Sequence, residues 1–379
     1  MHFNTLNAVR IKRTESNPVK VNKKSCFHLV FCVFLSCLSA PIFASDLSEK
    51  EKSISNPNIL KYDTLVCVRL NVNSEFDFFK ISGNDFYYDI RPNINLWNKL
   101  SVSYQHLTMN IGFKPAFLPG NGNNELKGET KSFSFGVQGY TKHWILELNY
   151  FKTKGFYLKN SGDFRTGWTE GVDPYIQFPE LGIKAFRGAT GYKFNPDFSL
   201  RAISMQTEKQ LKSSGSFIAF LNNDLFDIDN RGKNIDTTRQ TGQISKNFLL
   251  NGSLGYMYTH VISSDFYASL GILTGGGFQH IKLKTITPAG DIETQYTDPV
   301  FRMIEKAAFG YNHNRLYTGA EISLTQAIQM HKSTSVNTKT NRTYFQVFFG
   351  YRINAPGFLK KRMKKVMNFA PEIIKKNLE

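Results

Sequence analysis

Cysteine is scarce in this chain, with only four among 379 residues. Cys26, Cys32 and Cys37 lie in one apolar stretch near the N-terminus, which leaves Cys67 alone in the rest of the chain. A single cysteine cannot form an intrachain disulfide, so the fold must be stable without such cross-links. Long apolar runs are scarce as well. One stretch approaches the roughly 18 residues that a transmembrane helix needs, which excludes a bundle of membrane-spanning helices.

The one apolar stretch lies where an export signal would lie. Lys23 and Lys24 precede it, it begins at Cys26, and it closes at the small residue Ala44. A basic start, a short apolar segment and a small residue before the cut are typical of a secretory signal peptide, which we predict over residues 1–44. A retained membrane anchor is one alternative. Lipidation at Cys37 is another, because Leu35-Ser36-Cys37 loosely resembles a lipoprotein cleavage site.

Acidic residues are outnumbered by basic ones, 30 Asp and Glu against 47 Lys and Arg, and the formal net charge is +17. Aromatic residues make up 14% of the chain, which is too many for a disordered protein. The chain carries no basic-aromatic motif of the nucleic-acid-binding folds, so we expect no nucleic acid partner. For an exported protein, the polyanions within reach are anionic outer-membrane lipid and the phosphates of lipopolysaccharide.

Alternation of apolar and polar residues is the dominant pattern beyond the polar segment 45–62, which we predict as a flexible lead-in. Trp144, Leu146, Leu148 and Tyr150 give one such segment. Segments of this kind are about ten residues long, the length of a tilted transmembrane strand, and short turns alternate with long loops between them. This predicts an all-β fold, a single antiparallel transmembrane β-barrel over residues 63–353.

We count twelve strands, with ten or fourteen as alternatives, and an even count returns both ends of the barrel to the periplasm. The count requires residues 197–221 to form one long strand. A soluble β-sandwich is the competing fold, because its strands also alternate. The polar second face and the aromatic residues near the strand ends favour the barrel. The predicted segments are 64–91 containing the first strand, 94–105, 107–114, 131–140, 143–154, 182–194, 197–221, 251–262, 265–283, 300–311, 315–327 and 341–352.

Four short motifs in order resemble a known family. They are Arg91-Pro92-Asn93, Lys154-Gly155-Phe156-Tyr157-Leu158, the pair Gln206-Thr207-Glu208-Lys209-Gln210 and Lys212-Ser213-Ser214-Gly215-Ser216-Phe217, and Gly350-Tyr351-Arg352. Over roughly residues 60 to 358 the chain resembles a domain-of-unknown-function family of exported Gram-negative envelope proteins, regarded as outer-membrane β-barrels. The resemblance implies the outer membrane as location and a barrel as fold. It implies no activity and no catalytic residues.

The histidines show no spacing that suggests a metal site, and no phosphate-binding loop is present, so we predict no metal and no cofactor. Nucleophilic catalysis is harder to dismiss, because neighbouring strands can bring a histidine beside a serine. His143 is the best candidate for a base in such a site, although a weak one. The sequence therefore leaves enzymatic activity undecided and favours its absence.

Six charged residues are predicted to face the lumen, the interior of the barrel, because Arg or Lys facing lipid near the midplane costs roughly 2–4 kcal/mol. They are Glu147, Arg201, Arg302, Lys306, Glu321 and Arg352. Two interpretations are open, a lining that selects solutes and a set of internal ion pairs. The mixture of signs favours the second.

The last segment, 354–379, changes character. Leu359, Met363, Val366 and Met367 recur at helical spacing beside a basic group made up of Lys360, Lys361, Arg362, Lys364 and Lys365. This pattern predicts a short amphipathic helix that contacts anionic headgroups at the membrane surface. A solvated tail and a plug in the barrel mouth are the alternatives.

The leading functional hypothesis is a non-enzymatic outer-membrane protein that binds or passes a small solute or supports the envelope. The alternative is a membrane-embedded hydrolase that acts on lipid. The sequence does not specify a ligand, the state of the lumen or the oligomeric state.

Overall fold

The structure is a computed structural model that describes residues 53–74, 79–82, 87–230, 242–287, 289–329 and 339–369. The predicted signal peptide at 1–44 and the last ten residues lie outside this range. Among the described residues, no helix has the length and apolar character that crossing a membrane would require.

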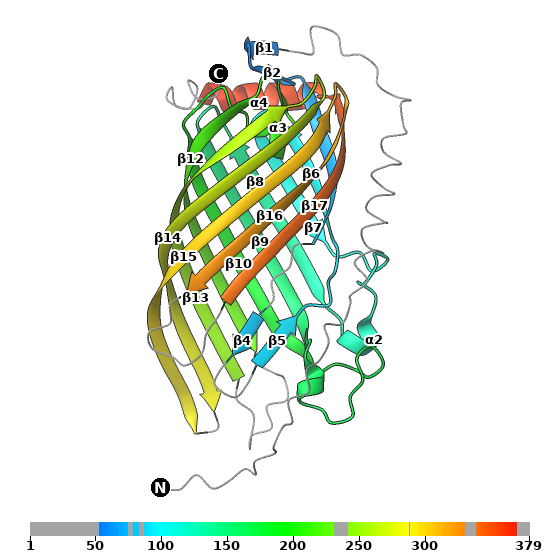
Figure 1. The fold of residues 1–379 in the computed structure, drawn as a ribbon, viewed down its shortest axis with the longest axis vertical. Helices are drawn as coiled ribbons and strands as arrows, with labels where there is room; N and C mark the ends of the chain where they lie inside the picture. The colour runs from blue at the N-terminus through cyan, green and yellow to red at the C-terminus, as the bar shows by residue number, and fades with distance from the viewer. Residues whose placement is uncertain are drawn as a thin grey trace. The chain divides into compact units, whose positions relative to one another are not determined.

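Twelve strands form a closed antiparallel barrel (Figure 1). Consecutive strands around the wall pair with each other, and β17 returns to pair with β3, so the wall has no free edge. The wall strands are β3 (Leu65–Asn73), β6 (Trp97–Tyr104), β7 (Leu107–Phe113), β8 (Lys131–Tyr140), β9 (Trp144–Leu158), β10 (Gln177–Lys193), β12 (Ser214–Asn230), β13 (Gly242–Val261), β14 (Phe266–Thr287), β15 (Gly290–Asn312), β16 (Leu316–Gln329) and β17 (Lys339–Asn354). The predicted twelve-stranded all-β barrel is confirmed, and the sandwich is excluded.

The polarity of the wall is the reverse of that in a soluble protein. Along β7, Met109 and Ile111 point outward and are exposed, whereas Thr108 and Asn110, which alternate with them, are buried inside. Other wall strands repeat this arrangement, with Leu100 and Val102 on β6 and Leu254 and Tyr256 on β13. An apolar outer band around a polar interior is the arrangement of outer-membrane barrels, in which closure satisfies every backbone group.

Several strands are longer than predicted. β13, β14 and β15 have 20, 22 and 23 residues. Together with β12 they include most of the described residues of the segments 222–250 and 284–299, which we expected to be loops. Outward positions on the far part of β15 are polar, for example Glu293 and Gln295. Beyond the apolar band both faces of a strand meet water, so hydrogen bonding continues while the hydrophobic alternation that reveals a strand stops.

The prediction that residues 197–221 form one strand is wrong. The wall strand β12 begins only at Ser214, and the residues before it contain the helix α3 (Arg201–Ser204) and the strand β11 (Glu208–Gln210). Phe198, Ile203 and Met205 turn into the lumen and form one buried cluster with wall residues. Burial of these apolar side chains inside the barrel outweighs continuation of the wall.

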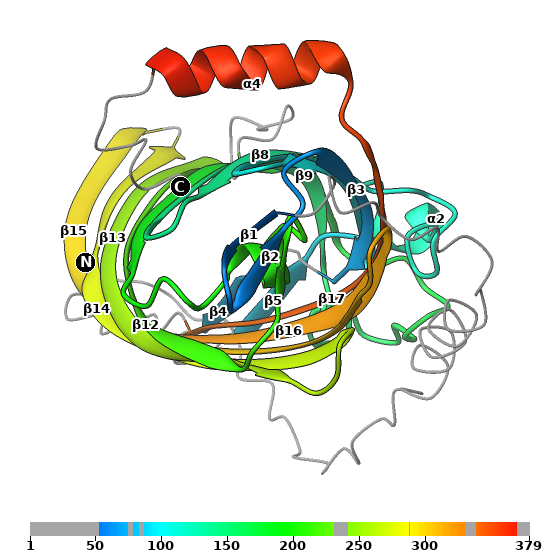
Figure 2. The same ribbon diagram turned by 90° about the horizontal axis from the view of Figure 1, so that it is seen from above.

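The helix α3 and strand β11 belong to a plug, which we define as residues 53–64 and 195–213. Its strands β1 (Ser53–Asn56), β2 (Ile59–Lys61) and β11 form a separate three-stranded sheet inside the ring of wall strands (Figure 2). Ile59 and Leu60 are buried. The second half of the expected flexible lead-in at 45–62 therefore forms strands. We call the end of the barrel that holds the plug the plugged end, and the opposite end the loop end.

The loop end carries smaller elements. The hairpin of β4 (Phe79–Ser82) and β5 (Tyr87–Arg91) pairs with the end of β9, and α2 (Asn124–Lys127) and a 3₁₀ turn at Ser161–Asp163 lie in the loops (Figure 1). At the plugged end, α4 (Gly357–Phe369) follows β17 and lies outside the ring (Figure 2). A short C-terminal helix was predicted and is confirmed.

Candidate functional site

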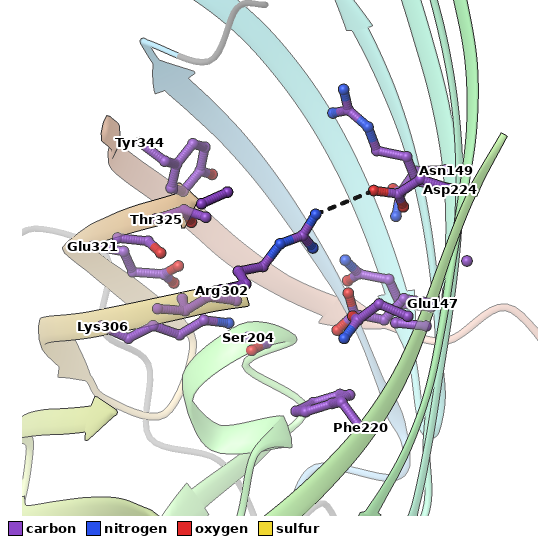
Figure 3. A pocket seen from close by; sticks show the side chains of 18 of the residues that line it. Glu147, Asn149, Ser204, Phe220, Asp224, Arg302, Lys306, Glu321, Thr325 and Tyr344 are labelled. Atoms are coloured by element: carbon purple, nitrogen blue, oxygen red, sulfur yellow. Dashed lines mark ion pairs between the residues drawn. The ribbon is translucent and has the colours of Figure 1, made fainter. Parts of the chain in front are cut away.

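A cavity of about 490 Å³ occupies the lumen next to the plug (Figure 3). Leu200, Ile203 and Ser204 of the plug form its floor. Its walls carry polar and charged side chains from strands on all sides of the barrel. Among them are Lys99, Glu147, Asn149, Asp224, Arg302, Lys306 and Glu321.

Two of the charged wall residues already have partners inside the cavity. Arg302 Nη2 on β15 lies 3.6 Å from Asp224 Oδ2 on β12, and this ion pair crosses the lumen (Figure 3). Glu147 accepts a hydrogen bond from the hydroxyl of Tyr140. The contact of Arg302 is an ion pair inside the lumen, whereas that of Glu147 is a hydrogen bond from a neutral group. Both interpretations of the charged lining stay predictions.

Lys306 and Glu321 differ from these pairs. They lie on the neighbouring strands β15 and β16 and face the same cavity (Figure 3). Glu321 Oε1 is buried and accepts no hydrogen bond. Within the described residues, Lys306 forms no hydrogen bond or ion pair. A buried polar atom without a partner is costly, so this part of the cavity offers an ammonium and a carboxylate to a bound solute or to water.

Arg201 lies in the plug and not on the wall. Its guanidinium is buried, with Nη1 2.8 Å from Glu208 Oε1 and Nε donating to Thr207 Oγ1 at 3.0 Å. Nη2 lies 3.6 Å from Asp63 Oδ1. Arg201 therefore holds together the two chain segments that make up the plug.

Arg352 points inward from β17, as alternation predicted, but it binds the plug and not the cavity. The side chain is completely buried and donates to the carbonyls of Gln206, His313 and Asn314 and to the side chain of Asn312, at 2.6–3.0 Å. The guanidinium also stacks on the rings of Tyr62 and Tyr317. This one arginine joins the plug to the wall.

The residue that receives Arg352 adopts an unusual backbone conformation. Gln206 has φ of +61°, a region that costs free energy for a residue with a side chain. In this conformation its backbone carbonyl accepts from Arg352 Nε and Nη2 and from Cys67 Sγ, while its side-chain amide donates to the hydroxyl of Tyr267. The sequence did not indicate a role for Gln206, because the same residues would be equally compatible with an exposed turn.

A second tether fastens the plug to the rim of the barrel. Lys209 Nζ of β11 donates to Asp265 Oδ1 at 2.6 Å, and His313 Nδ1 lies 2.9 Å from Asp265 Oδ2. Asp265 belongs to the turn between β13 and β14. Burial alone would raise the pKa of Asp265, but the hydrogen bonds and charges of Lys209 and His313 hold that pKa below its ordinary value.

Acid is expected to loosen this tether. Because the pKa of Asp265 is lower in the folded protein than the usual value of about 3.9, its ionised form contributes stability that is fully present above that value and is lost as the pH falls through the folded pKa. Protease cleavage of the plug should therefore accelerate below about pH 4, and Asp265→Asn should flatten that dependence. Asp291→Asn at the loop end, whose partner Lys284 is exposed, is the matched control. Identical pH profiles for the three proteins would contradict the tether.

The catalytic hypothesis gains little from the geometry. His143 lies at the plugged end between β8 and β9, where Nδ1 is 2.8 Å from the carbonyl oxygen of Lys193 and the ring stacks on Tyr192. The structure instead brings His260 Nδ1 to 3.3 Å from Ser213 Oγ, and that hydroxyl already accepts from the backbone of Val261. Within the described ranges, no carboxylate orients His260. Lipid hydrolysis stays a prediction.

No group of three or more metal-ligating side chains occurs in the part of the chain that the structure describes. Asp224 and Asn149 are cavity residues that the sequence did not indicate. Asp224 lies in a segment that we expected to be a loop, and Asn149 was indistinguishable from any polar residue on a strand.

The cations of the C-terminal segment lie on α4. Lys360, Lys361, Arg362 and Lys365 are exposed, and Lys364 lies in the same helix. Leu359 and Met363, one turn apart, pack on the outer wall against Val66 and Tyr104 of β3 and β6. The helix thus lies along the outside of the barrel at the plugged end.

These features define a closed twelve-stranded barrel of the outer-membrane type with an internal plug. A family model described as "Domain of unknown function (DUF4421)" matches residues 59–353. The chain belongs to this family, and the resemblance carried by the sequence motifs is confirmed.

The chain is also similar to solved barrels. The match to the outer membrane protease OmpT from Escherichia coli spans 79% of this chain and 100% of that protein, at 7% sequence identity and a TM-score of 0.36. The match to the toluene transporter TodX of Pseudomonas putida spans 79% of this chain and 90% of that protein, at 8% sequence identity and a TM-score of 0.24. At these values no activity or ligand transfers to this chain. No curated protein matches it.

Proposed function

We propose that this protein is an outer-membrane barrel that binds a small solute in its lumen and does not form an open pore. The solute class that fits the cavity carries both an anionic and a cationic group. Lys306 would receive the anionic group and Glu321 the cationic group. The remaining polar lining would provide hydrogen bonds.

The membrane location is supported by the outer band of apolar side chains and by the predicted signal peptide. A wall that exposes Leu107, Met109 and Ile111 side by side would aggregate in water. With the termini on the periplasmic side, the plugged end faces the periplasm and the loop end faces outward. The solute would then enter from the outside.

The observation that carries the proposal is the contact of the plug with strands all around the barrel. The plug touches Tyr140 and Ile145 on one side, Met257 and Tyr267 on another, and Arg352 on a third. Contacts in all these directions support a lumen that is closed at the periplasmic end. Closure, combined with a buried carboxylate oxygen of Glu321 and an ammonium of Lys306 that make no hydrogen bonds within the described residues, fits binding better than free passage.

The proposal is tested by conductance and binding with the same purified protein. We expect planar bilayers to show no stable open-pore conductance, and calorimetry with glycylglycine to detect binding. Lys306→Met and Glu321→Gln should each weaken that binding about tenfold, the result of losing about 1.4 kcal/mol of interaction. Glu293→Gln, an exposed carboxylate at the loop end, is the control. Steady pore conductance by the unmodified protein, or unchanged affinity in both cavity variants, would overturn the proposal.

We also propose that α4 contacts anionic headgroups of the inner leaflet of the outer membrane. The helix packs one side on the wall through Leu359 and Met363 and exposes its cations, the arrangement of an interfacial helix. Each cation near such a surface contributes about 1 kcal/mol. Replacing Lys360 and Lys361 with Glu in the full chain should reduce the yield of folded barrel in anionic vesicles and leave it unchanged in neutral ones. An equal effect in both would point to a structural role alone.

A further inference from the structure

One carboxylate lies on the outer, lipid-facing surface of the barrel. On β15, Arg302, Ile304, Lys306 and Ala308 line the lumen cavity. The residues that alternate with them, Met303, Glu305 and Ala307, lie on the opposite, outer face of the strand. Glu305 is one of these outward residues, between Met303 and Ala307. Its cross-strand partners, Ile272 of β14 and Leu324 of β16, are also on the apolar outer surface.

The depth of Glu305 places it well inside the apolar band. Phe301 and Phe309 are exposed on the same face, one four residues before Glu305 and the other four residues after it. At about 3.3 Å per residue and a tilt near 40°, each lies about 10 Å from Glu305 along the membrane normal. The apolar band of such barrels is about 25 Å tall. Glu305 is thus near its middle, where no water is available to solvate a carboxylate.

The carboxylate of Glu305 makes no direct polar contact with a described residue that would offset this position. Glu305 forms no hydrogen bond or ion pair with any described residue. It lies in a shallow groove on the outer wall, whose lining is mostly apolar and aromatic: Tyr256, Tyr258, Leu270, Ile272, Ile322 and Leu324. Lys306 also borders this groove, but it forms no ion pair with Glu305. Ionisable residues that face the interior of a membrane are rare, and they mark sites that a partner satisfies.

The same surface carries a donor that could satisfy the carboxylate. Gln326 on β16 is outward and exposed, one outward position beyond Leu324, and it too makes no hydrogen bond within the described ranges. Its amide donates hydrogen bonds, whereas Glu305 accepts them. The two lie diagonally on adjacent strands, so the patch holds both an acceptor and a donor. A twofold contact between identical surfaces requires this kind of self-complementarity.

We infer that the outer surface of β13 to β16 around Glu305 is the interface of a homodimer in the membrane. The occupant of the groove is the same surface of a second copy, related by a twofold axis along the membrane normal. In that arrangement Gln326 of each protomer donates to Glu305 of the other. The apolar groove residues pack around this polar pair and exclude lipid.

Cross-linking in native outer-membrane fragments tests the interface. Leu324→Cys lies at the groove, and Met109→Cys, exposed on β7 across the barrel, is the matched control. The single cysteine of the mature chain, Cys67, is buried and should not react. With a short bis-maleimide, Leu324→Cys should give a product of twice the monomer mass and Met109→Cys should not. A product of any other mass, or no difference between the two variants, would overturn the proposal.

The role of the carboxylate is tested separately in the folded barrel. Glu305→Leu should still fold, as its heat-sensitive gel mobility would show, because it replaces a charge in the apolar band by an apolar side chain. Hydrogen bonds between membrane segments contribute enough that their loss should weaken dimerisation about three- to tenfold. Gln326→Leu should weaken it to a similar extent, and the double variant should add little. A dimer that resists dilution equally well in all three variants would overturn the polar contact and with it the proposed interface.

Discussion

Replacing Arg352 by Met is expected to release the plug from the wall. The guanidinium is fully buried and satisfies three backbone carbonyls and the side chain of Asn312 while stacking on two tyrosine rings. Methionine fills much of the volume but leaves those oxygens buried without donors, and each such orphan costs about 1–3 kcal/mol. We expect the free energy of unfolding to fall by at least about 3 kcal/mol and planar bilayers to show frequent channel openings.

Two further variants separate the geometry of Arg352 from its charge. Arg352→Lys keeps the charge but offers one ammonium group in place of the planar fork of donors, so it should recover only part of the stability and part of the closure. Arg165→Met removes an exposed guanidinium from the loop between β9 and β10 and should change neither. If Arg352→Met remained closed and as stable as the unmodified protein, Arg352 would not anchor the plug.

The wall of the barrel could be predicted from the sequence because two simple requirements coincide there. A strand that separates lipid from a polar lumen must alternate, and the segment 131–140 was predicted with the bounds that the structure shows for β8. Where a strand keeps its backbone hydrogen bonds but has no lipid on one face, its sequence need not alternate, and the prediction of its bounds was wrong. The far parts of β14 and β15 keep their hydrogen bonds in water, so they are strands without the alternation that identifies one.

The plug could not be predicted for a different reason. Its residues Phe198, Leu200 and Ile203 are apolar at spacings that a strand and a short helix share, and their burial depends on a lumen that the rest of the chain creates. Alternation therefore predicts Arg201 on the wall, although its polar partners lie in the plug. Arg352 was placed on the correct face, yet the sequence could not show that the lumen at that level is occupied by Gln206.

One part of the candidate binding site could be predicted from alternation, and another part depends on how the barrel closes around the plug. Glu147, Arg302, Lys306 and Glu321 were predicted to point inward by alternation, and the structure places all four around one cavity. Which of them are already paired depends on distances across the lumen, such as that from Arg302 to Asp224. Such distances follow from barrel closure and plug placement, which no local pattern encodes.

Breaking the buried ion pair of Arg201 and Glu208 should lower the free energy of unfolding by a large amount. Nη1 and Oε1 are 2.8 Å apart, and the two side chains are 4% and 8% exposed. Arg201→Met leaves the Glu208 carboxylate buried without its cation, which should destabilise the protein by about 3–5 kcal/mol. Arg201→Met combined with Glu208→Leu removes both charges, so the double variant should lose less than the sum of the two single ones.

A double-mutant cycle in urea, with far-UV circular dichroism as the signal, measures this coupling free energy. The exposed pair of Lys154 and Glu180, 3.0 Å apart, is the matched control. Water and salt screen an exposed pair, so its cycle should give less than about 1 kcal/mol. A coupling between Arg201 and Glu208 no larger than that of Lys154 and Glu180 would mean that water reaches the plug pair, and the lumen could not then be closed at that end. The expected coupling is several times larger, because the plug keeps both charged groups away from water.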